Sequence, residues 1–414
     1  MDEKKAGSAY RGLRGCAYRK KFDIALFFGS KAFSYGDLLT RAEYAYNSFR
    51  QMGVEKGERV CLWLPDCPDL LAAFYGLSRL GAIPVLCHPQ SVPRELQNQM
   101  ETTQSKLLVT TPFRYRQYLE RIGTFPDSHL ILCRPERDLK GREQKEFSEK
   151  EPACQVGGFD FEELLKANRY NANEIPALEP EIPAVILFGS SGFLSCEPVS
   201  YLSGELEETV EIFDCRRERI QTVFVENSFA SEGGFLAVHS ALCRGITVLW
   251  SVGDPLPYLA KKMPDYLVGT EEFFWELRQK TDLFKGNWVN LLGGIQIGKD
   301  RTPLMSKFAA KAFLETGGKG ALLNAPIPLK VQKEELYFVK DFGVRLADME
   351  RAISSLPGVA ACQCIGEGSG IRLRLQPAGN TDAAALGRKV LAYCREEMNE
   401  FHVPEKLEFS ANIQ

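Results

Sequence analysis

The segment ILFGSSGFLSCEPV, residues 186–199, places a glycine- and serine-rich loop directly after an apolar run. Small residues at the end of a buried strand let backbone N–H groups close around an anionic ligand. A phosphate loop also carries a basic side chain that holds the phosphate charge. Here the first charged residue after the glycines is Glu197. The segment therefore leaves two alternatives, a phosphate loop that lacks its cation or a plain tight turn.

Apolar runs alternate with helical patterns on both sides of this segment. The predicted helices include 34–52, where Ser34 and Asp37 form a capping box, a helix that Pro68 opens and Gly81 closes, and 93–103. An alternation at intervals of about 20 to 25 residues is typical of a parallel sheet covered by helices. The predicted strands are 60–64, 83–87, 107–110, 130–133, 183–188, 221–225, 246–250, 265–269, 289–297 and 320–323.

The pattern changes near residue 330. Strand pairs are predicted at 335–345 and 359–376, helices at 347–355 and 381–399, and a last strand at 406–409. We therefore expect an α/β protein with two domains. Residues 1–330 form a large N-terminal domain of helix-covered, mostly parallel sheets, and residues 331–414 form a small α+β domain. The polar segment 134–180 is predicted to be a loop that separates two α/β subdomains of the large domain.

Composition excludes several classes of function. The net charge of −3 argues against a general nucleic-acid binder, and no run of about 18 apolar residues predicts a membrane span. Basic residues concentrate in residues 1–21, which we interpret as a solvated, frayed terminus. Twelve cysteines without a CxxC motif indicate free thiols in a reducing, cytoplasmic setting. Cys362 and Cys364 share one strand face, but no metal site is predicted there or among the four scattered histidines.

Two familiar catalytic loops are absent. The segment lacks GxxxxGK[ST], and it lacks the GxSxG pattern that would make Ser190 or Ser191 a nucleophile. One pair of nucleophile and base is conceivable, Cys87 with His88. Adjacent residues on a strand point to opposite faces, so this pair is not expected to act together. No catalytic residue is assigned from the sequence.

The whole chain resembles the adenylate-forming superfamily, whose members include acyl- and aryl-CoA synthetases. Gly189, Ser190, Ser191 and Gly192 align without a gap with its phosphate loop, roughly L-F/Y-T-S-G-T-T-G-x-P-K-G-V. Further matching segments are Phe33-Ser34-Tyr35, Gly53 to Val60, Leu64-Pro65-Asp66, Ala72 to Gly76, Arg79 to Val85, Val339 to Gly343, Leu356 to Val359 and Phe401 to Pro404. The resemblance implies a large N-terminal domain and a mobile C-terminal domain that begins near Lys340 and Gly343.

Such enzymes adenylate a carboxylic acid with ATP and Mg²⁺ and pass the acyl group to a thiol, usually that of CoA. Carried over position by position, most of the ATP-site residues are missing here. The lysine of the loop falls at Glu197, and the motif that supplies the magnesium-ligating glutamate reads Asn324 to Pro328. The ribose-binding aspartate is missing between Lys330 and Glu335, and the chain ends at Gln414 before the family's C-terminal lysine motif. No cofactor is therefore predicted with certainty.

Three functional hypotheses follow. The first is a pseudoenzyme that binds an acyl, aryl or CoA-like ligand, or that is the partner of an intact ligase or acyl carrier protein. The second is a divergent but active acid–thiol ligase, and the third is a structural protein whose loop is a turn. The predicted pocket is lined by Asn227, Phe229, Gly233, Gly293 and Gly294. Close packing of a helix on a strand is an equal alternative for these glycines.

Overall fold

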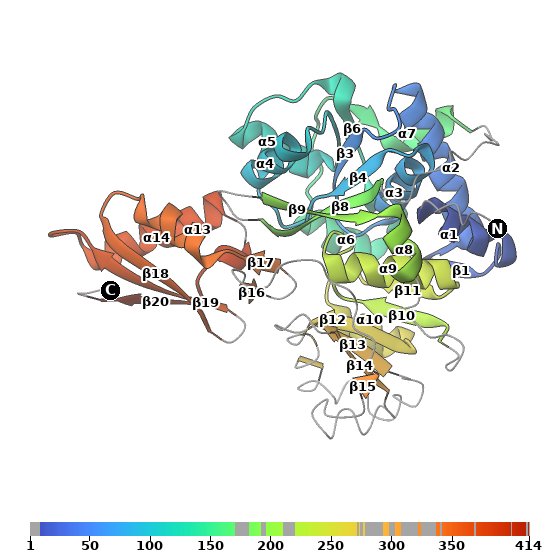
Figure 1. The fold of residues 1–414 in the computed structure, drawn as a ribbon. Helices are drawn as coiled ribbons and strands as arrows, with labels where there is room; N and C mark the ends of the chain where they lie inside the picture. Colours follow the sequence, from blue (N-terminus) through green and yellow to red (C-terminus); the bar gives the residue numbers. More distant parts are fainter. Residues whose placement is uncertain are drawn as a thin grey trace.

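The fold was described from a computed structural model (Figure 1). The structure describes residues 9–169, 182–191, 196–209, 220–270, 273, 276–277, 293–297, 303–307, 322–323, 337–339, 342–367, 370–398, 400–410 and 413. Within these ranges, two large sheets form the N-terminal part, and a separate α+β module follows. This arrangement confirms the predicted α/β fold with a large and a small part.

The first sheet has seven strands, and its middle strands are buried on both faces. From β7 to β8 all neighbours are parallel, whereas β9 is antiparallel to β8. Along β3, Val60 and Leu62 belong to the large core, while Cys61 and Trp63 pack with helices on the other face. Continuous apolar runs thus identify strands that are covered on both sides. The order is β7 (Phe159–Asp160), β6 (Leu130–Leu132), β5 (Leu107–Thr110), β3 (Arg59–Trp63), β4 (Ile83–Leu86), β8 (Pro183–Ser191) and β9 (Cys196–Leu202).

The second sheet has eight strands, and the N-terminal hairpin β1–β2 lies at one of its edges. The strands from β13 to β1 are parallel to their neighbours, and β2, β14 and β15 are antiparallel. The chain therefore begins in the second sheet and then builds most of the first. The order is β15 (Leu322–Leu323), β14 (Pro303–Lys307), β13 (Gly293–Ile297), β12 (Tyr266–Thr270), β10 (Thr222–Val225), β11 (Thr247–Trp250), β1 (Ile24–Phe28) and β2 (Lys31–Ser34).

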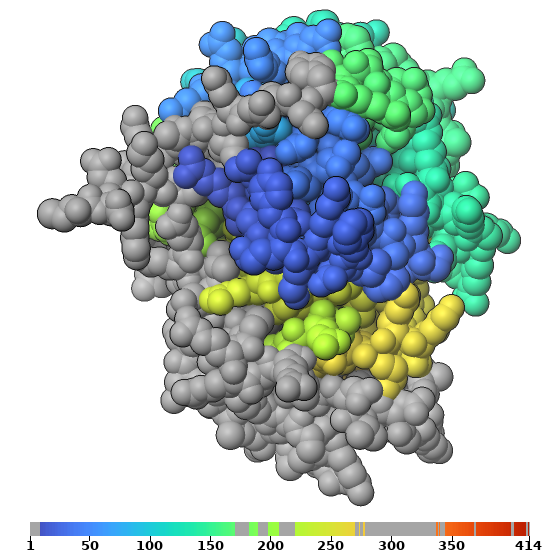
Figure 2. All heavy atoms as spheres, turned by 90° about the vertical axis from the view of Figure 1, so that its right-hand side faces the viewer, coloured from blue at the N-terminus to red at the C-terminus, as the bar shows by residue number. Residues whose placement is uncertain are grey.

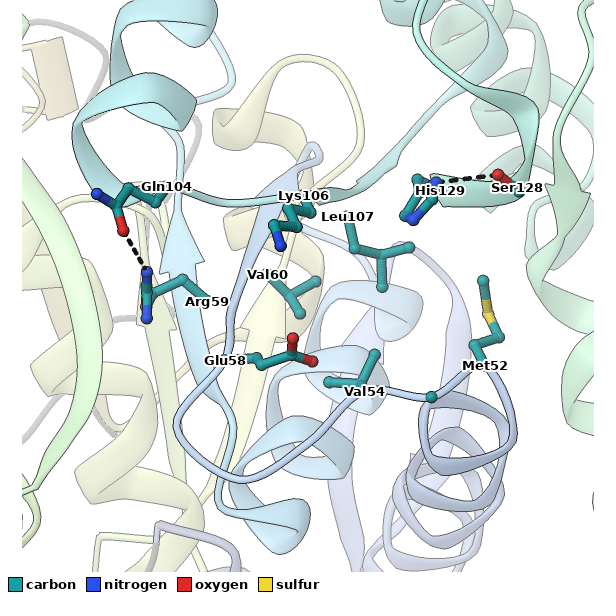
Figure 3. A pocket seen from close by; sticks show the side chains of 11 residues that line it. Met52, Val54, Glu58, Arg59, Val60, Gln104, Lys106, Leu107, Ser128 and His129 are labelled. Atoms are coloured by element: carbon teal, nitrogen blue, oxygen red, sulfur yellow. Dashed lines mark hydrogen bonds between the residues drawn. The ribbon is translucent and has the colours of Figure 1, made fainter.

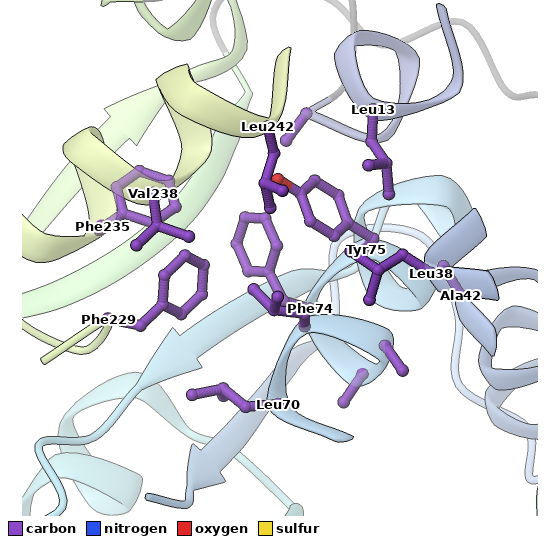
Figure 4. Packing of buried hydrophobic residues seen from close by; sticks show 14 of the residues in the cluster. Leu13, Leu38, Ala42, Leu70, Phe74, Tyr75, Phe229, Phe235, Val238 and Leu242 are labelled. Carbon is purple, nitrogen blue, oxygen red and sulfur yellow. The ribbon is translucent and has the colours of Figure 1, made fainter. Parts of the chain in front are cut away.

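Helices connect the two sheets through a shared aromatic core (Figure 4). Phe74 of α3 lies 5.3 Å from Phe229 and 5.5 Å from Phe235, measured between ring centroids. These edge-on contacts join an element of the first sheet to elements of the second. The helices are α2 (Tyr35–Gln51), α3 (Pro68–Leu80), α4 (Pro93–Thr103), α5 (Pro112–Arg121), α8 (Ser203–Thr209), α9 (Glu232–Arg244) and α10 (Pro255–Lys262).

The segment 134–180 was wrongly predicted to be a loop. Its described part contains the 3₁₀ turn η2 (Pro135–Asp138), α6 (Gly141–Lys150) and α7 (Phe161–Ala167). Helix α6 escaped recognition because only Phe147 is buried and the rest of its surface is polar. Strands before and after this segment, β6 and β8, lie in the same sheet. The first sheet therefore continues across the segment that was expected to separate two subdomains.

The interpretation of residues 1–21 as a frayed terminus is wrong for its described part. Residues Ala9–Arg19 form helix α1, which buries Tyr10, Leu13, Cys16 and Ala17. Its first turn is fixed because the backbone N–H of Tyr10 donates to Ser78 Oγ (3.1 Å). The apolar residues recur at helical spacing, but the many basic residues between them obscured that pattern.

The C-terminal module has a hydrophobic core of its own. Both strand pairs were predicted, and β20 is confirmed at 406–409, where it pairs parallel with β19. The module contacts the first sheet through an Arg121–Glu397 ion pair (3.0 Å). Its elements are β16 (Tyr337–Val339), β17 (Phe342–Val344), α13 (Leu346–Ser354), β18 (Val359–Glu367), β19 (Gly370–Pro377), α14 (Ala383–Glu397), η6 (Glu400–His402) and β20 (Lys406–Phe409). The boundary at residues 330 and 331 lies outside the described residues and stays a prediction.

Candidate functional site

The carboxyl ends of the strands in both sheets meet near the loop that follows β10. Asp66, just after β3, accepts a hydrogen bond from the backbone N–H of Phe229 (2.9 Å), and Ser228 Oγ donates to the same carboxylate oxygen (3.4 Å). Ligands of α/β proteins bind beyond the carboxyl ends of strands. This contact between the sheets therefore marks the place where a ligand site is expected.

The loop before α9 is held by a close backbone approach. Ser231 caps α9 by accepting from the N–H of Gly234 (3.2 Å), and its hydroxyl donates to the carbonyl of Ser228 (2.7 Å). A Cβ at position 234 would lie 2.0 Å from that same carbonyl oxygen. Gly234 is thus required by the close approach of the loop that precedes its own helix. Gly233 is buried in the first turn of the helix.

Asn227 is the predicted pocket residue with a buried polar side chain. Its side chain is 1% exposed, and within the described residues neither Oδ1 nor Nδ2 has a hydrogen-bond partner. A buried carboxamide without partners is costly, and it is commonly explained by a water or ligand that satisfies it. Phe229, two residues later, is fully buried in the aromatic core. Its ring packs against Phe74 and Phe235 and so anchors the loop.

A buried hydrogen bond that sequence reasoning missed lies beside this loop. The hydroxyl of Tyr201, on β9, donates to the carboxylate of Glu232 in the first turn of α9. The bond ties the strand that follows the glycine-serine loop to the helix that follows Asn227. No sequence signal pairs these residues, because they are separated by 31 positions, one on a strand of the first sheet and the other on a helix.

The glycine-serine loop connects β8 to β9 as a hairpin. Ser191 pairs with Cys196, and Phe188 pairs with Pro198. Gly189, Ser190 and Ser191 end β8, and Glu197 is the second residue of β9, while Gly192 lies outside the described residues. The side chains of 189–197 also lie outside what the structure describes. The backbone is thus placed, and the effect of the Glu197 charge stays a prediction.

The remaining predicted site residues are placed apart from Asn227. Gly293 and Gly294 pair with Tyr266 and Leu267, at the beginning of β12. Asn227 follows the end of β10, where the register aligns Val225 with Val268. Gly293 and Gly294 are therefore level with Val223 and Phe224 inside β10, and not with Asn227 beyond its carboxyl end. Gly343 lies in β17, and Lys340 lies outside the described residues.

Cys87 and His88 do not form a catalytic pair in the structure. The Cys87 thiol is fully buried and donates to the carbonyl of Val85 (3.9 Å). His88 Nδ1 instead accepts from the N–H of Gln90 (3.2 Å), and its ring lies 5.7 Å from that of Phe401 in the C-terminal module. The described residues contain no cluster of three or more histidine, cysteine or acidic side chains that could hold a metal.

A separate cavity of about 320 Å³ lies at the amino ends of β3 and β5 (Figure 3). Arg59, one of its lining residues, donates from Nε to the carbonyl of Thr103 (2.7 Å), so it caps the end of α4. None of the predicted site residues lines this cavity. The lining residues are Met52, Gly53, Val54, Glu58, Arg59, Val60, Gln104, Lys106, Leu107, Ser128 and His129.

Comparison with known families agrees with this geometry. The model of the "AMP-binding enzyme" family matches residues 13–192, which run from α1 through the glycine-serine loop. Over residues 13–192 the chain is therefore similar to the AMP-binding enzyme family. The match covers α2, α3 and the parallel strands of the first sheet, together with Asp66. Among the helices that the structure describes, none has the length and apolar character needed to cross a bilayer.

Curated proteins that are similar to parts of this chain include crotonobetaine/carnitine–CoA ligases. The enzyme of Salmonella arizonae is 34% identical over 119 residues, which are 27% of this chain and 23% of the relative. That of Salmonella agona is 29% identical over 162 residues, or 39% of this chain and 28% of the relative. The matched region thus spans about a quarter of the length of these relatives.

Solved structures of adenylate-forming enzymes share the fold of nearly the whole chain. The o-succinylbenzoate CoA synthetase of Bacillus subtilis has a TM-score of 0.70 at 14% identity, with 97% of this chain and 95% of that chain covered. The amide bond synthetase of Marinactinospora thermotolerans has a TM-score of 0.74 at 14% identity, with 99% and 96% covered. Other neighbours were solved with AMP or with anthranoyl-AMP. These likenesses establish the fold.

Proposed function

We propose that this chain is an AMP-binding acyl- or aryl-CoA ligase homologue that binds an acyl or aryl ligand but has lost ATP-dependent adenylation. The proposal rests on the acidic side chain of Glu197. In the resemblance to the phosphate loop of the adenylate-forming family, Glu197, which lies in β9, takes the position of the loop cation.

The size of the repulsion between Glu197 and a bound phosphate follows from Coulomb's law. Two like charges about 4 Å apart repel by about 4 kcal/mol at an effective dielectric constant of 20. Replacing the attractive lysine by a repulsive glutamate therefore weakens triphosphate binding by several powers of ten. The residue at this position does not fit ATP. The absent magnesium and ribose motifs at Asn324 to Glu335 act in the same direction.

A retained ligand pocket is supported by Asn227. Its buried carboxamide can donate to or accept from a polar group of a bound acyl or aryl compound. Asp66 and Gly234 hold the loop that carries it. A role beside an intact ligase or an acyl carrier protein belongs to the same proposal, because a ligase would supply the missing adenylation and a carrier protein would accept the acyl group. A divergent but active acid–thiol ligase is the alternative.

The decisive experiment measures ATP–pyrophosphate exchange with a panel of acyl and aryl carboxylic acids, and ATP–Mg²⁺ binding by calorimetry. We expect no exchange from the native chain and an increase in ATP affinity of at least about 100-fold for Glu197→Lys. Glu149→Lys, which makes the same charge change on α6, is the matched control and should leave ATP affinity unchanged.

Two results would contradict the proposal. Pyrophosphate exchange by the native chain with any of the acids would show that adenylation survives. An ATP affinity that is equal in Glu197→Lys and Glu149→Lys would show that the hairpin is not a nucleotide loop. Binding of the acids without exchange, lost in Asn227→Leu, would support the retained pocket.

A further inference from the structure

Two aromatic side chains are exposed where α1 ends, one in its last turn and one in the turn that follows. Figure 2 shows the N-terminal segment in the foreground. The exposed fraction is 67% for Tyr18 and 88% for Phe22. Phe22 is the most exposed large apolar side chain of the described residues. Arg19 and Lys21, which lie between these two residues in the sequence, are also exposed. A phenylalanine that is almost fully in water gains nothing from folding, so its position calls for another explanation.

The segment that carries these rings is strongly basic. Between residues 9 and 23 the charged side chains are Arg11, Arg14, Arg19, Lys20 and Lys21 against the single acid Asp23. The chain as a whole carries a net charge of −3, so the charge of this segment has the opposite sign. Two of these basic side chains lie over the aromatic rings. The guanidinium of Arg14 is 4.9 Å from the centroid of the Tyr18 ring, and the ammonium of Lys21 is 5.8 Å from that of the Phe22 ring.

The backbone holds this turn in place. The N–H of Lys20 donates to the carbonyl of Cys16 (2.9 Å), and Lys20 Nζ donates to the carbonyl of Gly245 at the end of α9 (2.9 Å). The carbonyl of Lys21 accepts from the N–H of Gly36 (2.9 Å). Helix α1 itself is anchored by its buried face. The two aromatic rings are therefore presented by a structured element.

We propose that residues 18–22, YRKKF, dock on the surface of a bilayer that contains anionic lipid. Basic residues near such a surface each contribute about 1 kcal/mol of attraction, and aromatic side chains settle at the boundary of headgroups and acyl chains. A stable protein interface needs a contiguous patch, whereas here two isolated rings protrude among cations. The charge and the protruding rings match a lipid surface best.

The test is co-sedimentation of the full chain with vesicles of phosphatidylcholine alone or with 30 mole per cent phosphatidylserine (a chosen composition, roughly that of an anionic leaflet). We expect binding to the anionic vesicles only. Arg19→Gln with Lys21→Gln should weaken it by about 20- to 30-fold, which is about 1 kcal/mol for each charge removed. Phe22→Ser should also weaken it, and higher salt should reduce the binding of the native chain.

Matched controls change the same chemistry elsewhere. Arg388→Gln with Arg395→Gln removes two exposed charges from α14, and Phe409→Ser removes a partly exposed ring from β20. Both should bind like the native chain. Equal binding to neutral and anionic vesicles, or none to either, would overturn the proposal. So would unchanged binding by Phe22→Ser, or tighter binding to a single-stranded RNA than to the anionic vesicles in the same buffer.

Discussion

Replacing His239 by glutamine should remove a measurable part of the acid sensitivity of the fold. His239 lies on α9, where its Nδ1 is 3.1 Å from the hydroxyl of Tyr75 and its Nε2 is 3.7 Å from the thiol of Cys243. The Phe235 ring stacks on it at 5.6 Å. Burial lowers the pKa of His239 from 6.5 to about 4, because its charged form would lose its hydration. The two polar neighbours have raised pKa values and stay neutral at these pH values.

The sign and size follow from the difference in pKa between the folded and unfolded chain. The folded pKa is depressed, so the stability that neutral His239 allows is present above pH 6.5 and is lost as pH falls from 6.5 toward 4. Below about pH 4 the imidazole is protonated in both states and the loss levels off. Between pH 7 and pH 5 this one group should lower the free energy of unfolding by about 2 kcal/mol.

The assay is urea unfolding at pH 7 and pH 5, followed by tryptophan fluorescence. The free energy of unfolding of the native chain should fall by about 2 kcal/mol more between these pH values than that of His239→Gln. Comparing the two proteins cancels all other titrating groups. His129→Gln, at an exposed position, should retain the native pH dependence. If His239→Gln and the native chain lose the same free energy on acidification, the imidazole is not the buried group inferred here.

Two further predictions concern the loop that carries Asn227. Gly234→Ala should lower the free energy of unfolding by at least about 2 kcal/mol, because its Cβ would meet the Ser228 carbonyl oxygen at 2.0 Å. Both variants are compared by thermal unfolding. Gly15→Ala, whose added Cβ would have its nearest neighbour 3.6 Å away, should be neutral or stabilising. Equal losses of stability in the two variants would refute the steric argument. Asp66→Ala should cost about 1 to 3 kcal/mol in urea unfolding, because the buried N–H of Phe229 loses its acceptor. Asp66→Asn retains an acceptor and should recover most of that loss, so identical losses for Ala and Asn would contradict it.

Local signals account for most of the elements that were predicted correctly. The capping box of Ser34 and Asp37 begins α2, and Gly81 ends α3 with a positive φ of 77°. Helix 93–103 and strand 107–110 were predicted to the residue. The matching segments of the adenylate-forming family were likewise readable, and the fold they implied is confirmed.

The errors arose where burial depends on distant partners. Helix α6 has one buried apolar residue, Phe147, which packs 6.4 Å from Phe28 in the other sheet. Helix α1 looked like a charged terminus because the elements that cover its apolar face follow much later in the chain. A window of about ten residues contains none of this information.

The sequence alone determined the element types, the relationship to adenylate-forming enzymes and the acidic residue in the glycine-serine loop. Helix periodicity, caps and strand runs are set by neighbours within a few positions, which is why a linear reading recovers them. Only the tertiary structure decided that Asp66 holds the loop 163 residues away, that Asn227 is buried without a partner in the described chain, and that Gly293 is level with Val223 inside β10. Those relations depend on strand register and on packing summed over both sheets, and no local segment encodes them.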